Sequence, residues 1–131
     1  MVLPHRALVW KDSRVTPDEM KTRTKKFALR ILNLAEKLPR GVKGRILADQ
    51  IGRADTSVAA NYRATCKARS KAEFIAKIGV AEEEADEVQF WLEMISEDGL
   101  VPPKRLIELQ QEARELTAIL AASRKSAARR K

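Results

Sequence analysis

Hydrophobic residues recur every three or four positions along four long segments of the chain, which is the spacing of amphipathic helices. The first segment covers residues 17–38. It begins at Thr16-Pro17-Asp18-Glu19, where Thr and Glu form a capping box and Pro suits the first helical position. It ends at the turn signal Leu38-Pro39-Arg40-Gly41. The expected core positions of this helix are Met20, Phe27, Ile31, Leu34 and Leu38.

The other three segments predict helices over residues 43–67, 71–97 and 103–123. Small residues, among them Gly44 and Gly52, are frequent in the second segment, so neighbouring backbones can approach it closely. Ser70-Lys71-Ala72-Glu73 is a second capping box, and Asp98-Gly99 is a helix stop. The core is expected to include Leu47, Ile51, Val58, Phe74, Ile78, Leu92 and Leu116.

Short connections between four such helices predict an all-α fold, an antiparallel up-down-up-down four-helix bundle. We expect the bundle to occupy residues 16–123. Residues 1–15 are expected to form an irregular N-terminal tail, and residues 124–131 a flexible basic C-terminal tail. The chain has 131 residues, which is enough for one domain with a buried core.

The scarcity of cysteine and histidine disfavours several kinds of site. The chain holds one cysteine, Cys66, and one histidine, His5, so it cannot close an internal disulfide or build a Cys zinc site. A catalytic triad and a di-iron bundle are disfavoured as well. We expect no catalytic residue, no metal, no cofactor and no enzymatic activity. No apolar run approaches 18 residues, so we expect no membrane span and a cytoplasmic location.

The net charge of +8 is unevenly distributed along the chain. Residues 73–102 carry a net charge of −8, whereas residues 1–41, 42–72 and 103–131 carry +6, +5 and +5. One interpretation is that the acidic segment pairs with its basic neighbours, inside the bundle or across a subunit contact. The other is that the surplus positive charge faces RNA, DNA or an acidic protein surface.

The best candidates for contact with a polyanion lie in the first helix and in the C-terminal tail. Aromatic residues make up 5% of the chain, so no stacking platform for bases is evident. Recognition would therefore be directed at phosphates and would depend little on base sequence. The candidates are Lys21, Arg23, Lys25, Lys26, Arg30, Arg124, Lys125, Arg129 and Arg130.

A polar stripe runs along the second helix beside its apolar seam. Gln50, Arg53, Ser57 and Asn61 are spaced three and four residues apart and share a face. This stripe is either a structural network that fixes helix or subunit register, satisfied by carboxylates of the third helix, or a contact for a ligand or RNA.

The third helix offers possible partners for this stripe. Glu83 and Glu87 share a face, and without histidines we expect them to pair with arginines or a neighbouring subunit rather than with a metal. Trp91 adds apolar surface, together with Phe90 and Met94, and is expected to lie either in the core or at a subunit contact.

The second and third helices together carry a recognisable pattern. Residues 47–64 read L-A-D-Q-I-G-R-A-D-T-S-V-A-A-N-Y-R-A, and residues 68–78 read A-R-S-K-A-E-F-I-A-K-I. They are followed by E-E-E-A-D-E at 82–87 and W-L-E at 91–93. This pattern resembles the four-helix-bundle proteins of the 23S ribosomal RNA intervening-sequence family of bacteria, to which the accessory variability proteins of diversity-generating retroelements are related.

The resemblance covers residues 23–122, and R-A-D-T-S-V-A-A-N is its most specific part. The chain departs from the family at Asp55, where a small residue is more common, and at Ala64, where Glu is common. The resemblance implies a closed ring of subunits, commonly a homopentamer, with a basic surface and no known enzymatic activity.

In the retroelement branch, the resemblance also implies binding to a reverse transcriptase and to nucleic acid. Two functions stay open. One is a non-enzymatic oligomeric protein that binds nucleic acid or acts as a scaffold. The other is an accessory adaptor that docks a partner protein such as a retroelement reverse transcriptase.

Overall fold

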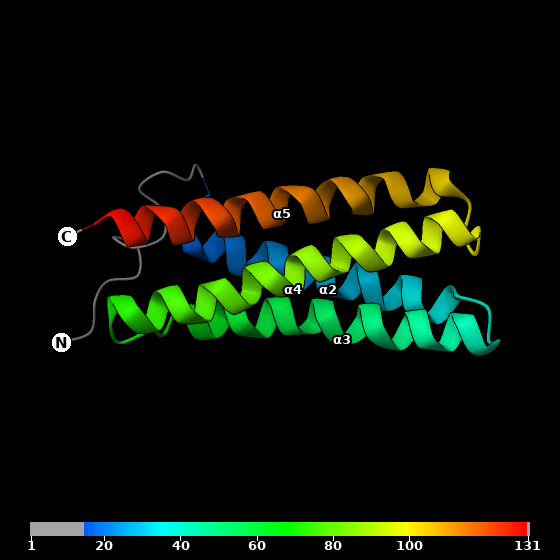
Figure 1. Cartoon of the computed structure of the whole chain (residues 1–131), viewed down its shortest axis with the longest axis horizontal. Coiled ribbons are helices and arrows are strands. Elements are labelled where there is room, and N and C mark those ends of the chain that lie inside the picture. The colour runs from blue at the N-terminus through cyan, green and yellow to red at the C-terminus, as the bar shows by residue number, and fades with distance from the viewer. Residues whose placement is uncertain (1–14, 131) are drawn as a thin grey trace.

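The computed structural model describes residues 15–130, and these residues form a four-helix bundle. Its helices are α2 (Pro17–Lys37), α3 (Val42–Thr65), α4 (Lys71–Asp98) and α5 (Pro103–Arg129). Each helix runs antiparallel to the one before it, and consecutive helices pack along their lengths (Figure 1). The predicted all-α fold is therefore confirmed. The predicted N-terminal tail lies, up to residue 14, outside the described residues.

The helix starts follow the capping signals of the sequence. The backbone N–H of Glu19 donates to Thr16 Oγ1 at 3.1 Å, and the N–H of Glu73 donates to Ser70 Oγ at 3.0 Å. Gly99 ends α4 with a backbone φ of 73°, in the left-handed region that residues with a Cβ atom rarely adopt. These local signals determine where each helix begins or ends, and therefore which helix ends lie next to each other.

The core consists of the predicted seam positions. Its large, fully buried side chains include Ile31 from α2, Ile51 from α3, Leu92 from α4 and Leu116 from α5. The other predicted core residues, Leu47, Val58, Phe74 and Ile78, are buried as well. Burying each such side chain stabilises the fold by about 1.5–3 kcal/mol relative to leaving it exposed.

The last helix continues beyond the predicted boundary. The sequence predicted its end at residue 123, whereas α5 extends to Arg129. Ser123, Ser126 and Ala127 are buried, so the final turns keep one packed face. Residues 121–128 also contain no Gly or Pro that would end a helix. The expected flexible tail is therefore helical over residues 124–129, and Lys131 lies outside the described residues.

One carboxylate is buried in the bundle without a partner. The Asp55 side chain on α3 is 1% exposed, and its Oδ2 atom has no hydrogen-bond partner among the described residues. Burial raises the pKa of Asp55 from 3.8 to about 7, because the charged form is poorly solvated there. The family resemblance had already marked this position as unusual.

The connection between α2 and α3 is packed tightly against the start of α3. Gly44 is buried in the first turn of α3, beside the backbone of Pro39. A Cβ atom at Gly44 would lie 1.6 Å from the Pro39 carbonyl oxygen, which is far inside van der Waals contact. Only glycine fits there without displacing the loop.

The first and last helices, α2 and α5, are neighbours with much less backbone contact than consecutive helices make. Charged side chains bridge part of this gap, because Arg23 and Arg30 of α2 reach carboxylates of α5. We call this boundary the α2–α5 seam. It is the least closely packed side of the bundle.

Candidate functional site

The antiparallel arrangement gathers positive charge at one end of the bundle. The start of α2, the α3–α4 connection and the end of α5 all lie at this end (left in Figure 1). Residues 15–26, 60–71 and 122–130 hold twelve Lys and Arg residues against two Asp and Glu residues, a net charge of +10. We call these three segments the basic end. Such a concentration of charge creates a positive potential that attracts polyanions.

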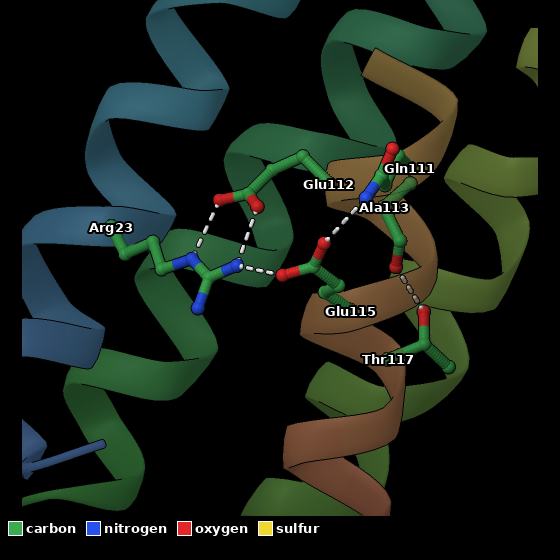
Figure 2. Close-up of polar contacts among 6 residues, drawn as sticks. All are labelled: Arg23, Gln111, Glu112, Ala113, Glu115 and Thr117. Carbon is green, nitrogen blue, oxygen red and sulfur yellow. Dashed lines mark hydrogen bonds and ion pairs between the residues drawn. The ribbon is translucent and has the colours of Figure 1, made fainter. Parts of the chain in front are cut away.

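Two of the predicted candidates in the basic end are already occupied by ion pairs. Arg23 Nε donates to Glu112 Oε2 at 2.8 Å, and Nη2 donates to Glu112 Oε1 at 2.6 Å and to Glu115 Oε1 at 2.7 Å (Figure 2). The hydrogen bonds that Arg23 donates to Glu112 raise the pKa of Arg23, and Arg23 in turn lowers the pKa of Glu115. Arg124 Nε donates to Glu82 Oε1 on α4 at 2.5 Å. Both arginines therefore join helices.

Other predicted cations are open to solvent. Lys25, Lys26 and Lys125 are exposed and form no ion pair within residues 15–130. Lys21 lies 3.4 Å from the exposed Asp18 carboxylate, an ion pair of little strength in water. Arg129 is the last residue of α5 and Arg130 is its C-cap. Arg30 lies outside the basic end and pairs loosely with Glu108.

Sequence reasoning missed four cations that belong to the same surface. Their positive charge is visible in the sequence. Their position beside α2 and α5 is not, because it arises only when α3 and α4 fold back as a hairpin. Two of the four, Arg63 and Lys67, are exposed and unpaired among the described side chains. The four residues are Arg63, Lys67, Arg69 and Lys71.

The polar stripe of α3 forms bonds mostly within its own helix. Arg53 Nη2 donates to Gln50 Oε1, and Asn61 Nδ2 donates to Ser57 Oγ at 2.9 Å. The carboxylate that interacts electrostatically with Arg53 is Glu84. Burial, reinforced by Glu87, raises the pKa of Glu84, and its Oε2 atom has no partner among the described residues. The sequence predicted that carboxylates of the third helix would satisfy the stripe. In the structure, Glu84 interacts electrostatically with Arg53, and no hydrogen bond or ion pair between described side chains joins the stripe to α4.

Glu83 and Glu87 do not pair with arginine in the described part of the chain. Glu87 Oε1 accepts a hydrogen bond from Trp91 Nε1 at 3.1 Å, and Glu83 is exposed. Trp91 is half-buried, and one side of its ring packs against the edge of the core. Its other neighbour is Phe90, whose ring centre lies 4.9 Å away in an edge-on contact.

The described residues hold no cluster of metal-ligating side chains. No group of three or more His, Cys, Asp or Glu side chains within residues 15–130 is placed to hold a metal ion. Burial raises the pKa of the Cys66 thiol, which reduces the thiolate available for reaction. Among these helices, none is both long enough and apolar enough to cross a membrane.

Comparison with known proteins places this bundle in a family. Residues 18–122 match the family described as 23S rRNA-intervening sequence protein. The chain belongs to this family. A solved structure from Bacteroides thetaiotaomicron, titled as a protein of unknown function from the S23 ribosomal protein family, is 30% identical with a TM-score of 0.77. The alignment covers 83% of this chain and 97% of that one. No curated protein matches the chain.

The family match covers the cations of α2 and α3 but not those at the end of α5. It ends at residue 122, whereas α5 continues to Arg129. Arg124, Lys125 and Arg129 thus extend the basic end beyond the region that carries the family pattern.

Two outward-facing surfaces of the bundle are not covered by any of the described residues. On α4, the apolar residues Val80, Phe90 and Met94 are 42%, 50% and 43% exposed and share an outer stripe with Glu83 and Glu87. We call this stripe the α4 outer face. Large apolar side chains grouped with acidic ones on an exposed helix are typical of an interaction surface.

The second surface is a groove between α2 and α3, with a volume of about 580 Å³. Its lining includes the apolar residues Leu29, Leu32 and Ala59, which we call its floor, and three cations, which we call its rim. Lys21, Lys25 and Arg63 form this rim. We call it the α2–α3 groove. Its apolar floor and positive rim are the chemical complement of the α4 outer face.

Proposed function

We propose that the protein is a non-enzymatic, self-associating protein that binds nucleic acid through phosphate contacts. The observation that carries this proposal is the basic end, where exposed cations from three segments have no carboxylate partner within residues 15–130. Within residues 15–130, ion pairs neutralise Arg23 and Arg124 but leave Lys26, Lys67 and Lys125 uncompensated. Phosphates would release counterions on binding these lysines, which provides the driving force.

The same geometry argues for weak base-sequence preference. Of the described aromatic residues, Phe27, Phe74 and Tyr62 are buried in the core and cannot stack on bases. Phe90 and Trp91 lie on α4, outside the three segments of the basic end. Cations at the ends of several helices follow the backbone of a nucleic acid by its charge and shape. We therefore expect similar affinities for unrelated RNA sequences of equal length and structure.

Replacing Lys26, Lys67 and Lys125 by Ala is expected to weaken binding to RNA and to reduce its salt dependence, and none of the three lines the α2–α3 groove. Three lost phosphate contacts should make the slope of log K against log salt shallower by roughly 2 on a single strand and roughly 3 on a duplex. Fluorescence anisotropy with nuclease-treated protein at several salt concentrations measures this slope. The lysines are exposed, so the helical content should not change.

The matched control removes the same charge elsewhere. Arg45, Lys104 and Arg114 are exposed cations outside the basic end that form no ion pair among the described side chains. Their replacement by Ala should leave the slope nearly unchanged. An equal loss in both triple variants would show that net charge alone governs binding. An absence of RNA and DNA binding at low salt would favour the adaptor function, with an acidic protein as the partner.

Self-association is the second part of the proposal, and its support is the complementarity of two surfaces. On the α4 outer face, Glu83 precedes Phe90 by seven residues, about 10 Å along the helix. On α2, Lys25 precedes Leu32 by the same seven residues. A second copy could therefore place its carboxylates at the basic rim and its Phe90 over the apolar floor of the α2–α3 groove. Contacts between two different faces build rings when the rotation closes, and a pentamer is the ring we propose.

Replacing Phe90 by Asp is expected to reduce the assembly to monomers at micromolar concentration. Phe90 is half-exposed, so the change should disrupt a contact between copies rather than the core. Light scattering measures the mass. Ile107→Asp is the control, because Ile107 is a similarly exposed apolar residue on α5, away from both surfaces. A wild-type protein that is monomeric, or a Phe90→Asp variant with unchanged mass, would contradict this interface.

A further inference from the structure

A second basic site lies at the opposite end of the bundle, in a cavity of about 490 Å³ between α2 and α5. Its polar lining consists of Arg30, Asn33 and Lys37 from α2 and Arg105 from α5. Leu34 and Leu109 contribute apolar wall, together with residues 100–102 of the α4–α5 connection. We call it the α2–α5 cavity.

The cavity follows from the helix register and from the loose α2–α5 seam. Arg30, Asn33 and Lys37 are separated by three and four residues, so they share one face of α2. That face points toward α5, where the two helices have little backbone contact. The seam is bridged by Arg23 near the basic end and is left hollow near the end of α2.

Every ionisable side chain that lines the cavity is a cation. No carboxylate lines it, and Lys37 and Arg105 form no ion pair within residues 15–130. Arg30 lies 3.7 Å from Glu108, but the Glu108 side chain is 89% exposed, so this contact compensates little of the charge. The cavity therefore combines uncompensated positive charge with an apolar wall.

We propose that the α2–α5 cavity binds a nucleotide through its 5′-phosphate. Two guanidinium groups and an ammonium group suit a phosphate dianion, because arginine forms paired hydrogen bonds to its oxygens. The apolar wall suits a flat base rather than a sugar with several hydroxyls, and the Asn33 amide can both donate to and accept from a base edge. The volume lies within the range of about 300–1,000 Å³ that is usual for small-molecule sites.

Two sources can supply this chemistry, a free nucleotide or the 5′-phosphorylated end of a nucleic-acid strand. Binding of a strand end would be part of the proposed nucleic-acid binding and rests on that proposal. Binding of a free nucleotide is independent of it. The basic end and the α2–α5 cavity are at opposite ends of the bundle, so variants in one should not alter the other.

Calorimetric titration of the full chain with adenosine 5′-monophosphate at low salt tests the inference. We expect saturable binding with one site per chain, and Arg105→Ala should weaken it by about tenfold or more. Lys104→Ala is the matched control, because Lys104 is the adjacent exposed cation on α5 and does not line the cavity. Adenosine lacks the phosphate and inorganic phosphate lacks the base, so each should bind at least tenfold more weakly than the monophosphate.

The same titration with a hexanucleotide, with and without a 5′-phosphate, distinguishes the two sources. Binding of the monophosphate alone identifies a free nucleotide, and a preference for the phosphorylated hexanucleotide identifies a strand end. The inference is overturned if neither binds, if adenosine binds as well as its monophosphate, or if Lys104→Ala and Arg105→Ala lose affinity equally. The Lys26, Lys67 and Lys125 triple variant should retain monophosphate binding, so failure of the proposed function gives a different result.

Discussion

Replacing Asp55 by Asn is expected to raise the free energy of unfolding by roughly 2–4 kcal/mol at pH 8. The folded protein holds this carboxyl in the core with one oxygen unpartnered, and burial raises its pKa to about 7. In the unfolded chain the same group ionises near its ordinary value of 3.8. Asparagine has nearly the same shape and carries no charge, so it removes the energetic penalty of ionisation.

The benefit of this substitution should depend on pH in a defined direction. Below about pH 4, Asp55 is protonated in both states, so its titration adds no difference between the variant and the wild type. Between pH 4 and 7 only the unfolded chain loses the proton, so the wild type becomes progressively less stable relative to the variant. Above pH 7 the difference is constant. Urea unfolding at pH 4, 6 and 8, at one protein concentration, measures this dependence.

Asp49→Asn provides the matched control, because Asp49 is an exposed carboxylate on the same helix. The same chemical change there should alter the unfolding free energy by less than about 0.5 kcal/mol. A stability difference between Asp55→Asn and wild type that stays flat from pH 4 to 8 would mean that burial does not raise the pKa of Asp55, and it would contradict the prediction.

Replacing Gly44 by Ala is expected to destabilise the protein by about 3 kcal/mol, although alanine is the better helix former. The added Cβ would lie 1.6 Å from the Pro39 carbonyl oxygen, which belongs to the backbone and cannot rotate away. The α2–α3 connection would have to move outward, and the buried start of α3 would move with it. Thermal and urea unfolding followed by circular dichroism measure the loss.

Gly79→Ala is the control for this prediction. Gly79 lies inside α4, and the nearest atom to an added Cβ is Arg124 Cδ at 3.9 Å, an ordinary contact. Alanine should therefore stabilise the protein at this position by about 0.5–1 kcal/mol. If Gly44→Ala were as stable as the wild type or more stable, as expected for Gly79→Ala, the close packing of the α2–α3 connection on Gly44 would be contradicted.

The sequence predicted the fold class well because its signals are local. The capping residues Thr16 and Ser70 and the helix stop at Gly99 act within a few residues, and the seam spacing repeats along each helix. The end of α5 could not be predicted in this way, because Ser123 and Ser126 look like exposed polar residues in the sequence. Their burial depends on what packs against the last turns.

The candidate site was harder to predict, because pairing decides which charges are available. Lys25 and Arg23 are two residues apart and looked equivalent, yet Arg23 is held by Glu112 and Glu115 and Lys25 is not. The partners of Arg23 are about ninety residues away in the sequence, so only the register of α2 against α5 reveals them. In the same way, Arg63 enters the basic end through the fold rather than through its sequence neighbours.

The loose α2–α5 seam has a consequence for how the molecule opens. α2 has one long packed neighbour, α3, whereas α3 and α4 each pack along two helices. Its attachment to α5 relies partly on the Arg23 and Arg30 contacts, which are accessible to water and are weakened by salt. α5 also has one long packed neighbour, but the contact of α2 with α3 is less extensive than that of α5 with α4. Partial unfolding should therefore begin with α2, whose amide protons would exchange with solvent before those of α3 and α4. The chain thus carries a unit of lower local stability that holds one wall of both the groove and the cavity.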